Sequence, residues 1–185
     1  MIKDVNNLKK RLFLIGLFCV LIISSCQGVF ASVFPDLEEN HWCYDTIVKY
    51  YQKGIIQGYE DGTFRPNNPI TRAEYVKIVN QFFAYSSDNT QKSDFTDIPE
   101  YAWYLAYVNE AVSRGYIKGY EDGTFRPNAP IRRQEAVAIL ARILKMDERK
   151  DTIMVQDALS QYRDKTEIQD WAYSLMNQFA FEHLL

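Results

Sequence analysis

Two arginines, Arg72 and Arg133, stand where helices are expected to begin, and their side chains could bind an anion. Arg72 belongs to the run Thr71-Arg72-Ala73-Glu74, which has the pattern of a capping box. In this motif the Thr71 side chain caps the helix, and Glu74 reaches back to the N–H of Thr71. Arg72 then takes the first helical position, N1, which we expect to be exposed.

A cation at N1 needs a reason, because the helix dipole disfavours positive charge at a helix start. One reason is an anion held jointly by the guanidinium of Arg72 and by the free N–H groups of the first turn. The alternative is an ion pair with one of three acids, Glu60, Asp61 or Asp97. The sequence alone leaves both interpretations open.

The run around Arg133 reads Arg132-Arg133-Gln134-Glu135 and departs from the first. Arg132 stands in the place of the capping threonine, so we expect the capping box to be lost, at a cost of about 1 kcal/mol. The second guanidinium either strengthens the attraction for an anion or marks a degraded site.

These two helix starts belong to an internal repeat with an offset of 61 residues. The ten residues Gly58–Asn67 return unchanged as Gly119–Asn128, and residues 34–85 match residues 95–146 at 22 of 52 positions. A loop kept unchanged suggests a special backbone or a binding surface. We therefore include four of its turn residues among the candidate binding residues: Asp61, Gly62, Asp122 and Gly123.

The loop is not a calcium loop of the EF-hand type. With Gly62 at position 6 of such a loop, positions 1, 3 and 12 fall on Gln57, Tyr59 and Asn68. None of these is the carboxylate that the motif requires. We predict instead a tight turn at Asp61-Gly62 with Phe64 directed inward, and neither a metal nor a cofactor.

The apolar periodicity predicts two helices in each repeat and an all-α fold. The first helices have stripes at Tyr44, Ile47, Val48 and Tyr51, and at Tyr104, Tyr107, Val108 and Ala111. Gly54 and Gly115 are expected to end these helices in the left-handed conformation. A third copy begins near residue 162 with the stripe Trp171, Ala172, Leu175, Met176, Phe179 and Ala180, and it does not continue into a second loop. Because each helix has one apolar face, the units must pack on one another.

The first 31 residues have the pattern of an export signal. A basic stretch precedes the apolar run from Leu12 to Ile23, which is shorter than the ~20 residues of a spanning helix. We predict cleavage after Ala31, with lipidation of Cys26 as a less favoured alternative and an uncleaved anchor as a third.

Cleavage leaves a net charge of −6, which disfavours nucleic acid as a partner. Cys43 then remains alone, and we interpret it as a small core residue or a cross-linking thiol.

Several motifs, in order and twice over, resemble the S-layer homology repeat. They are Phe34-x-Asp36, Trp42, Gly54-x-Ile56-x-Gly58-Tyr59-x-Asp61-Gly62-Thr63-Phe64-Arg65-Pro66 and Ile70-Thr71-Arg72-Ala73-Glu74. The resemblance divides the chain into a signal segment (1–31), repeat 1 (32–86), a linker (87–94), repeat 2 (95–146), a linker (147–161) and a partial repeat 3 (162–185).

The resemblance implies a pseudo-threefold helical bundle with an incomplete third repeat. It further implies that grooves between repeats bind secondary cell wall polysaccharide, often through pyruvylated sugars. Carried onto this chain, Arg72 would face a groove with Trp103, and Arg133 a groove with Trp171; Thr71 and Glu74 belong to the same motif. The alternative interpretation of Trp42 and Trp103 is that both are core residues that pack the first helices against the bundle.

The expected function is therefore that of a non-catalytic module that anchors an exported protein in the cell wall. His41 and His183 lie outside any nucleophile motif, so an enzyme is not predicted. One alternative is an assembly protein whose repeats pair with other chains, either by self-association or with a partner that completes repeat 3. A second is a fragment of a larger exported enzyme.

Overall fold

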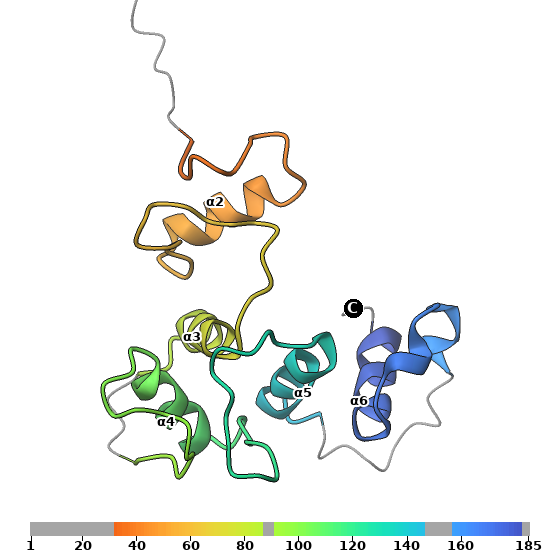
Figure 1. Ribbon diagram of the computed structural model, residues 1–185. Helices are drawn as coiled ribbons and strands as arrows, with labels where there is room; N and C mark the ends of the chain where they lie inside the picture. Colours follow the sequence, from red (N-terminus) through yellow and green to blue (C-terminus); the bar gives the residue numbers. More distant parts are fainter. Residues whose placement is uncertain (1–31, 87–90, 147–156, 183–185) are drawn as a thin grey trace, which may run out of the picture.

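The computed structural model describes residues 32–86, 91–146 and 157–182, so the predicted signal segment and most of the second linker lie outside it. The described chain is helical (Figure 1). Its elements are α2 (Tyr44–Gln52), α3 (Arg72–Phe82), α4 (Leu105–Ser113), α5 (Arg133–Ile143), the short helices η1 (Ala158–Gln161) and η2 (Lys165–Glu167), and α6 (Asp170–Phe181). Within these ranges no strand forms apart from an isolated bridge between Thr71 and Pro130, which confirms the all-α prediction.

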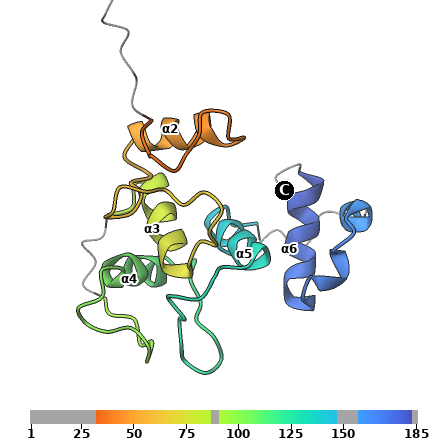
Figure 2. The same cartoon turned by 45° about the horizontal axis from the view of Figure 1, so that its top comes forward.

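The repeats interlock, because the second helix of one packs on the first helix of the next. Helix α3 contacts α4, and α5 contacts α6, as both ribbon views show (Figures 1 and 2). None of the helices in the described part of the chain is long and apolar enough to cross a membrane.

The main core lies between repeats 1 and 2. Val76 and Val79 of α3 pack there with Val108 and Ala111 of α4, and Phe125 from the second loop is fully buried among them. Burial of an aromatic or branched side chain contributes about 1.5–3 kcal/mol. Among the described residues, this junction holds the largest of the three cores.

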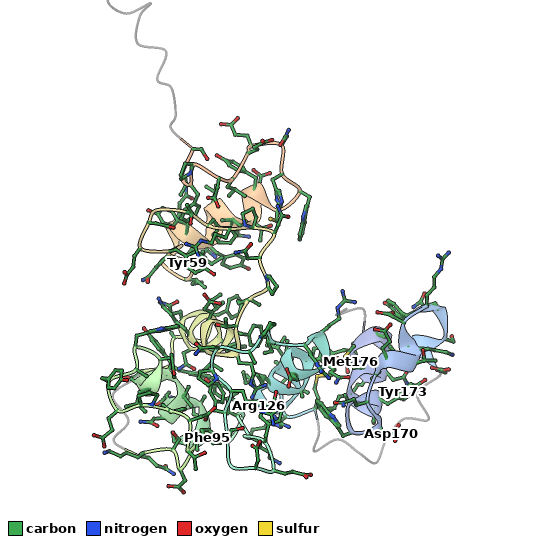
Figure 3. All side chains as sticks on the ribbon, in the orientation of Figure 1. Tyr59, Phe95, Arg126, Asp170, Tyr173 and Met176 are labelled. Atoms are coloured by element: carbon green, nitrogen blue, oxygen red, sulfur yellow. The ribbon has the colours of Figure 1, made fainter. Side chains whose placement is uncertain are left out.

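A second core joins repeat 2 to the partial third repeat. Val137 and Ala141 of α5 pack against Met176 and Phe179 of α6, and Met176 lies between the two helices in Figure 3. The predicted stripe of α6 is confirmed except at its first member. Trp171 is 51% exposed and does not belong to the core.

The last residue of the predicted α2 stripe is partly exposed, although its ring contacts that of the buried Phe34. Ile47 is buried, as is Val108 at the matched position of α4, but Tyr51 is 41% exposed. The offset of 61 maps Ala111 onto Tyr50 rather than Tyr51, and the Tyr50 ring contacts Phe82. The two predicted stripes are offset by 60 residues, one fewer than the repeat itself.

Two smaller predictions concern the ends of α2 and α4. The backbone at Gly54 and Gly115 has φ of 71° and 77°, which confirms the left-handed helix ends. Cys43 is half-buried at the edge of the small core of Phe34, Leu37 and Ile47, in line with its interpretation as a core residue.

Candidate functional site

The start of α3 is a complete capping box, as predicted. The Thr71 hydroxyl accepts a hydrogen bond from the N–H of Glu74 at 3.3 Å, and the Thr71 N–H donates to the Glu74 carboxylate at 2.8 Å. Burial raises the pKa of Glu74, but hydrogen bonds from Thr71 and Tyr59 outweigh it, so this pKa lies below its ordinary value.

Arg72 is buried rather than exposed, which corrects our expectation for N1. Only 5% of the residue is accessible. Its Nε donates to the carbonyl of Phe125 at 2.8 Å, and its guanidinium lies 3.2 Å from the Glu135 carboxylate. The guanidinium also covers the rings of Tyr120 and Phe125. The alternative of an ion pair was therefore right, although the partner is none of the three acids that we considered.

The free N–H groups of the first turn of α3 are also occupied by protein. The N–H of Arg72 donates to the carbonyl of Ala129 at 2.9 Å, and that of Ala73 to the carbonyl of Pro127 at 3.0 Å. The helix start is thus capped by the loop of the next repeat. The prediction that Arg72 and these N–H groups jointly hold an anion is wrong for this junction, because loop carbonyls accept the hydrogen bonds of the same donors.

The repeated loop has a structural reason to keep its sequence. Asp36 accepts hydrogen bonds from the N–H groups of Phe64 and Arg65, and Asp97 does the same for Phe125 and Arg126. These contacts hold each arginine at a positive φ, 58° for Arg65 and 57° for Arg126, a backbone conformation that non-glycine residues rarely adopt.

The turn residues serve the same loop. The side chain and N–H of Thr63, together with Arg65, lower the pKa of Asp61 to about 2. Thr124 and Arg126 do the same for Asp122, whose pKa is also about 2. The predicted turn at Gly62 is confirmed by its φ of 80° and by its hydrogen bond to the carbonyl of Tyr59. Binding of a ligand by Asp61, Gly62, Asp122 or Gly123 stays a prediction.

The start of α5 differs from that of α3, as its sequence indicated. The Arg132 side chain has no acceptor atom and makes no capping bond. Glu135 still accepts a hydrogen bond from the Arg132 N–H at 3.0 Å, so half of the capping box survives. The expectation that the box is lost is therefore right only for its threonine half.

Arg132 and Arg133 are both exposed and line a surface cavity of about 380 Å³. Across the ranges that the structure describes, neither guanidinium has an ion-pair partner. The cavity lies between α5 and the third repeat. Its wall combines two arginines, one amide, two acids and four largely apolar side chains: Arg132, Arg133, Gln134, Asp164, Glu167, Leu159, Tyr162, Ile168 and Met176.

The tryptophans are exposed, which contradicts their interpretation as core residues. Trp42 is 91% and Trp103 is 56% exposed. The Trp103 ring lies 5.7 Å from the ammonium of Lys77 on α3, so a lysine accompanies this tryptophan in place of the predicted Arg72. Trp171 lies on the third repeat next to Gln169, and it is not part of the cavity wall beside Arg133.

An amide pair between repeats was missed from the sequence. Gln134, at the start of α5, and Gln169, just before α6, exchange two hydrogen bonds at 2.9 and 3.0 Å. The indole N–H of Trp171 donates to the same Gln169 side chain at 2.8 Å. The signal in the sequence was that the longer, polar Gln134 stands in the place of the small Ala73 of repeat 1.

Comparison with known proteins identifies the repeats. The profile of the S-layer homology domain matches residues 33–76 and 94–137. Over 116 residues, 60% of this chain, the sequence is 40% identical to a cellulosome-anchoring protein of Acetivibrio thermocellus, of which it covers 26%.

Two further relatives are a surface-layer protein and an amylopullulanase. The S-layer protein sap of Bacillus anthracis is 32% identical over 62% of this chain, and 14% of that protein is covered. An amylopullulanase of Thermoanaerobacterium thermosulfurigenes is 30% identical over 77% of the chain, which covers 7% of it. The chain thus spans about a quarter or less of the length of these relatives.

Proposed function

The chain belongs to the S-layer homology family through two of its repeats, and from this premise we propose that it anchors a protein to the cell wall. In this proposal the chain is exported to the cell surface and binds an acidic wall polysaccharide without catalysing a reaction. A pyruvylated secondary polymer is the proposed ligand. The cellulosome-anchoring and S-layer relatives support the role at the cell surface.

The observation that carries the binding proposal is the pair of guanidinium groups in the cavity at the start of α5, neither of which has an ion-pair partner among the described residues. An arginine fork can bind a carboxylate through two parallel hydrogen bonds, and the two groups lie beside a half-buried aromatic residue, Tyr162. Mixed apolar and polar walls of this kind suit a sugar that carries an acidic substituent. Arg133 is therefore our first candidate for the contact with the acid.

Co-sedimentation with purified cell walls tests the proposal. The protein should sediment with walls that keep their anionic polymer and stay soluble when the polymer is stripped. Arg133→Ala should weaken sedimentation more than Arg133→Lys, because an ammonium cannot make the bidentate contact. Arg163→Ala, which removes an exposed arginine outside the cavity, is the matched control and should bind like the wild type.

Equal sedimentation with stripped walls would refute recognition of the polymer. Equal binding by Arg133→Ala and Arg163→Ala would move the site away from the cavity. Trp103, beside Lys77, is then the next candidate, because it is an exposed aromatic residue next to a cation at the first junction.

Two other functions have an observation in their favour. Pairing with further chains is suggested by Phe64 and Pro66 of repeat 1, which are half-buried where their counterparts Phe125 and Pro127 are buried by α3. Sizing of the protein in solution would reveal such association. Attachment of these repeats to an exported enzyme is suggested by the amylopullulanase relative.

A further inference from the structure

The two junctions between repeats are built differently at one position. At the first junction Ala73 is almost fully buried, and its N–H donates to the carbonyl of Pro127 in the next loop. At the second junction the matched residue is Gln134, which is buried to a similar degree. Within the described residues no loop carbonyl accepts from the N–H of Gln134, and its side chain extends to the third repeat instead.

The contact between Gln134 and Gln169 leaves little freedom to either side chain. Gln134 donates through Nε2 and accepts at Oε1, while Gln169 accepts at Oε1 and donates through its backbone N–H. The Gln169 oxygen accepts a second bond from the indole of Trp171. The Gln134 amide is held through both its donor and its acceptor, so its orientation is fixed, and the Gln169 oxygen is held by two donors.

This amide pair lies at the end of α5 that carries the cavity. Gln134 lines the cavity next to Arg132 and Arg133. Val137 and Met176 are among the apolar contacts between α5 and α6. Apolar contacts are not directional, so the hydrogen-bonded pair adds a directional contact that orients the start of α6 relative to Arg133.

We propose that Gln134 is a positioning residue of the polysaccharide site: through Gln169 it fixes Trp171 and the third repeat beside the cavity of Arg133. This inference rests on the proposed function. A site that is held in its binding geometry loses less conformational freedom on binding, and this raises affinity. The first junction lacks this amide pair, because Ala73 has no side-chain amide. There Arg72 is bonded to the Phe125 carbonyl and to Glu135.

The test compares the wild-type protein with Gln134→Ala, Gln169→Ala and the double variant. Affinity for soluble wall polymer is measured by calorimetry, and Tm is measured for each protein. Gln134→Ala should weaken binding about tenfold, and the double variant should weaken it no further, because Gln134 makes both hydrogen bonds of the pair. Gln169→Ala keeps the bond from its backbone N–H and should weaken binding no more than Gln134→Ala does. Gln161→Ala, which removes an exposed amide on η1, is the control and should change nothing.

A spectroscopic readout separates positioning from a merely structural role. The indole N–H resonance of Trp171, assigned with Trp171→Phe, should move in Gln134→Ala without any polymer present, because Gln169 is released. If Gln134→Ala lowers Tm but binds as tightly as the wild type, or leaves the indole resonance in place, the inference is wrong. If the wild-type protein itself does not bind, the proposed function fails and the inference falls with it.

Discussion

At the scale of single residues, two arginines at matched positions have opposite environments. Arg72 is buried between Glu135 and a loop carbonyl, whereas Arg133 is exposed beside a cavity. The capping box was predictable from four residues, because it depends only on local spacing. The burial of Arg72 was not predictable in this way, since its partners lie 53 and 63 positions away in the chain.

We expect Arg72→Ala to lower the free energy of unfolding by on the order of 3 kcal/mol, because it leaves the half-buried Glu135 without its cation. Arg133→Ala should change it by less than about 0.5 kcal/mol, as surface substitutions usually do. Urea denaturation of both variants measures the difference. Equal losses would show that Arg133 also has a structural partner.

The two helix caps make a second matched pair. Thr71→Ala should destabilise the protein by about 1 kcal/mol through loss of the hydroxyl that caps the N–H of Glu74. Arg132→Thr should raise stability, because the Glu135 carboxylate already accepts the hydrogen bond from the N–H of residue 132. A threonine hydroxyl would complete the capping box. Thermal melts check both changes. A Tm for Arg132→Thr that does not rise would mean that the guanidinium of Arg132 contributes something that the cap cannot replace.

At the scale of elements, the loop and the helix start form one structural unit across two repeats. The sequence pointed to the loop through its identity in both repeats, but it left open whether backbone or binding was the cause. Asp36, Asp97 and the turn aspartates hold the loop in shape. Each loop is also closely approached by an aromatic ring, Phe34 against Gly58 and Phe95 against Gly119.

Gly119→Ala tests this close approach. A Cβ at position 119 would overlap the Phe95 ring and lie 2.8 Å from the carbonyl of Thr124. We expect a loss of roughly 1–3 kcal/mol, the usual cost of overpacking, measured as a shift of the urea midpoint. Gly123→Ala is a useful comparison, because its Cβ would meet nothing within 4 Å and only its φ of 76° opposes alanine. A larger loss at Gly123 than at Gly119 would mean that backbone conformation, rather than contact with Phe95, fixes the loop sequence.

At the scale of the whole molecule, stability is concentrated where repeats meet. Two tyrosines, the half-buried Tyr75 and the buried Tyr116, bridge the first two repeats. The hydroxyl of Tyr75 donates to the carbonyl of Ala136 at 3.3 Å, and that of Tyr116 donates to Asn80. The family resemblance gave the helical repeats, but no repeat pattern predicts these phenols, since the offset of 61 replaces Tyr75 by Ala136 and Tyr116 by Ile55.

These phenols predict a loss of stability at alkaline pH. Burial raises the pKa of Tyr75 to about 12, and burial likewise raises the pKa of Tyr116. In the unfolded chain a tyrosine has a pKa of about 10. A pKa that is higher in the folded state contributes stability that is fully present below pH ~10 and is lost as the pH rises through the folded value. Tm should therefore be nearly independent of these groups at pH 7–9 and fall above pH ~10.

Melting curves followed by circular dichroism between pH 7 and 12 measure this dependence. Tyr75→Phe removes one of the two ionisable hydroxyls and keeps the ring, so its Tm should fall less steeply above pH ~10 than that of the wild type. Tyr101→Phe is the control, because the Tyr101 side chain is 91% exposed. If Tyr75→Phe and the wild type lost stability in parallel up to pH 12, the alkaline transition would arise elsewhere than at the hydroxyl of Tyr75.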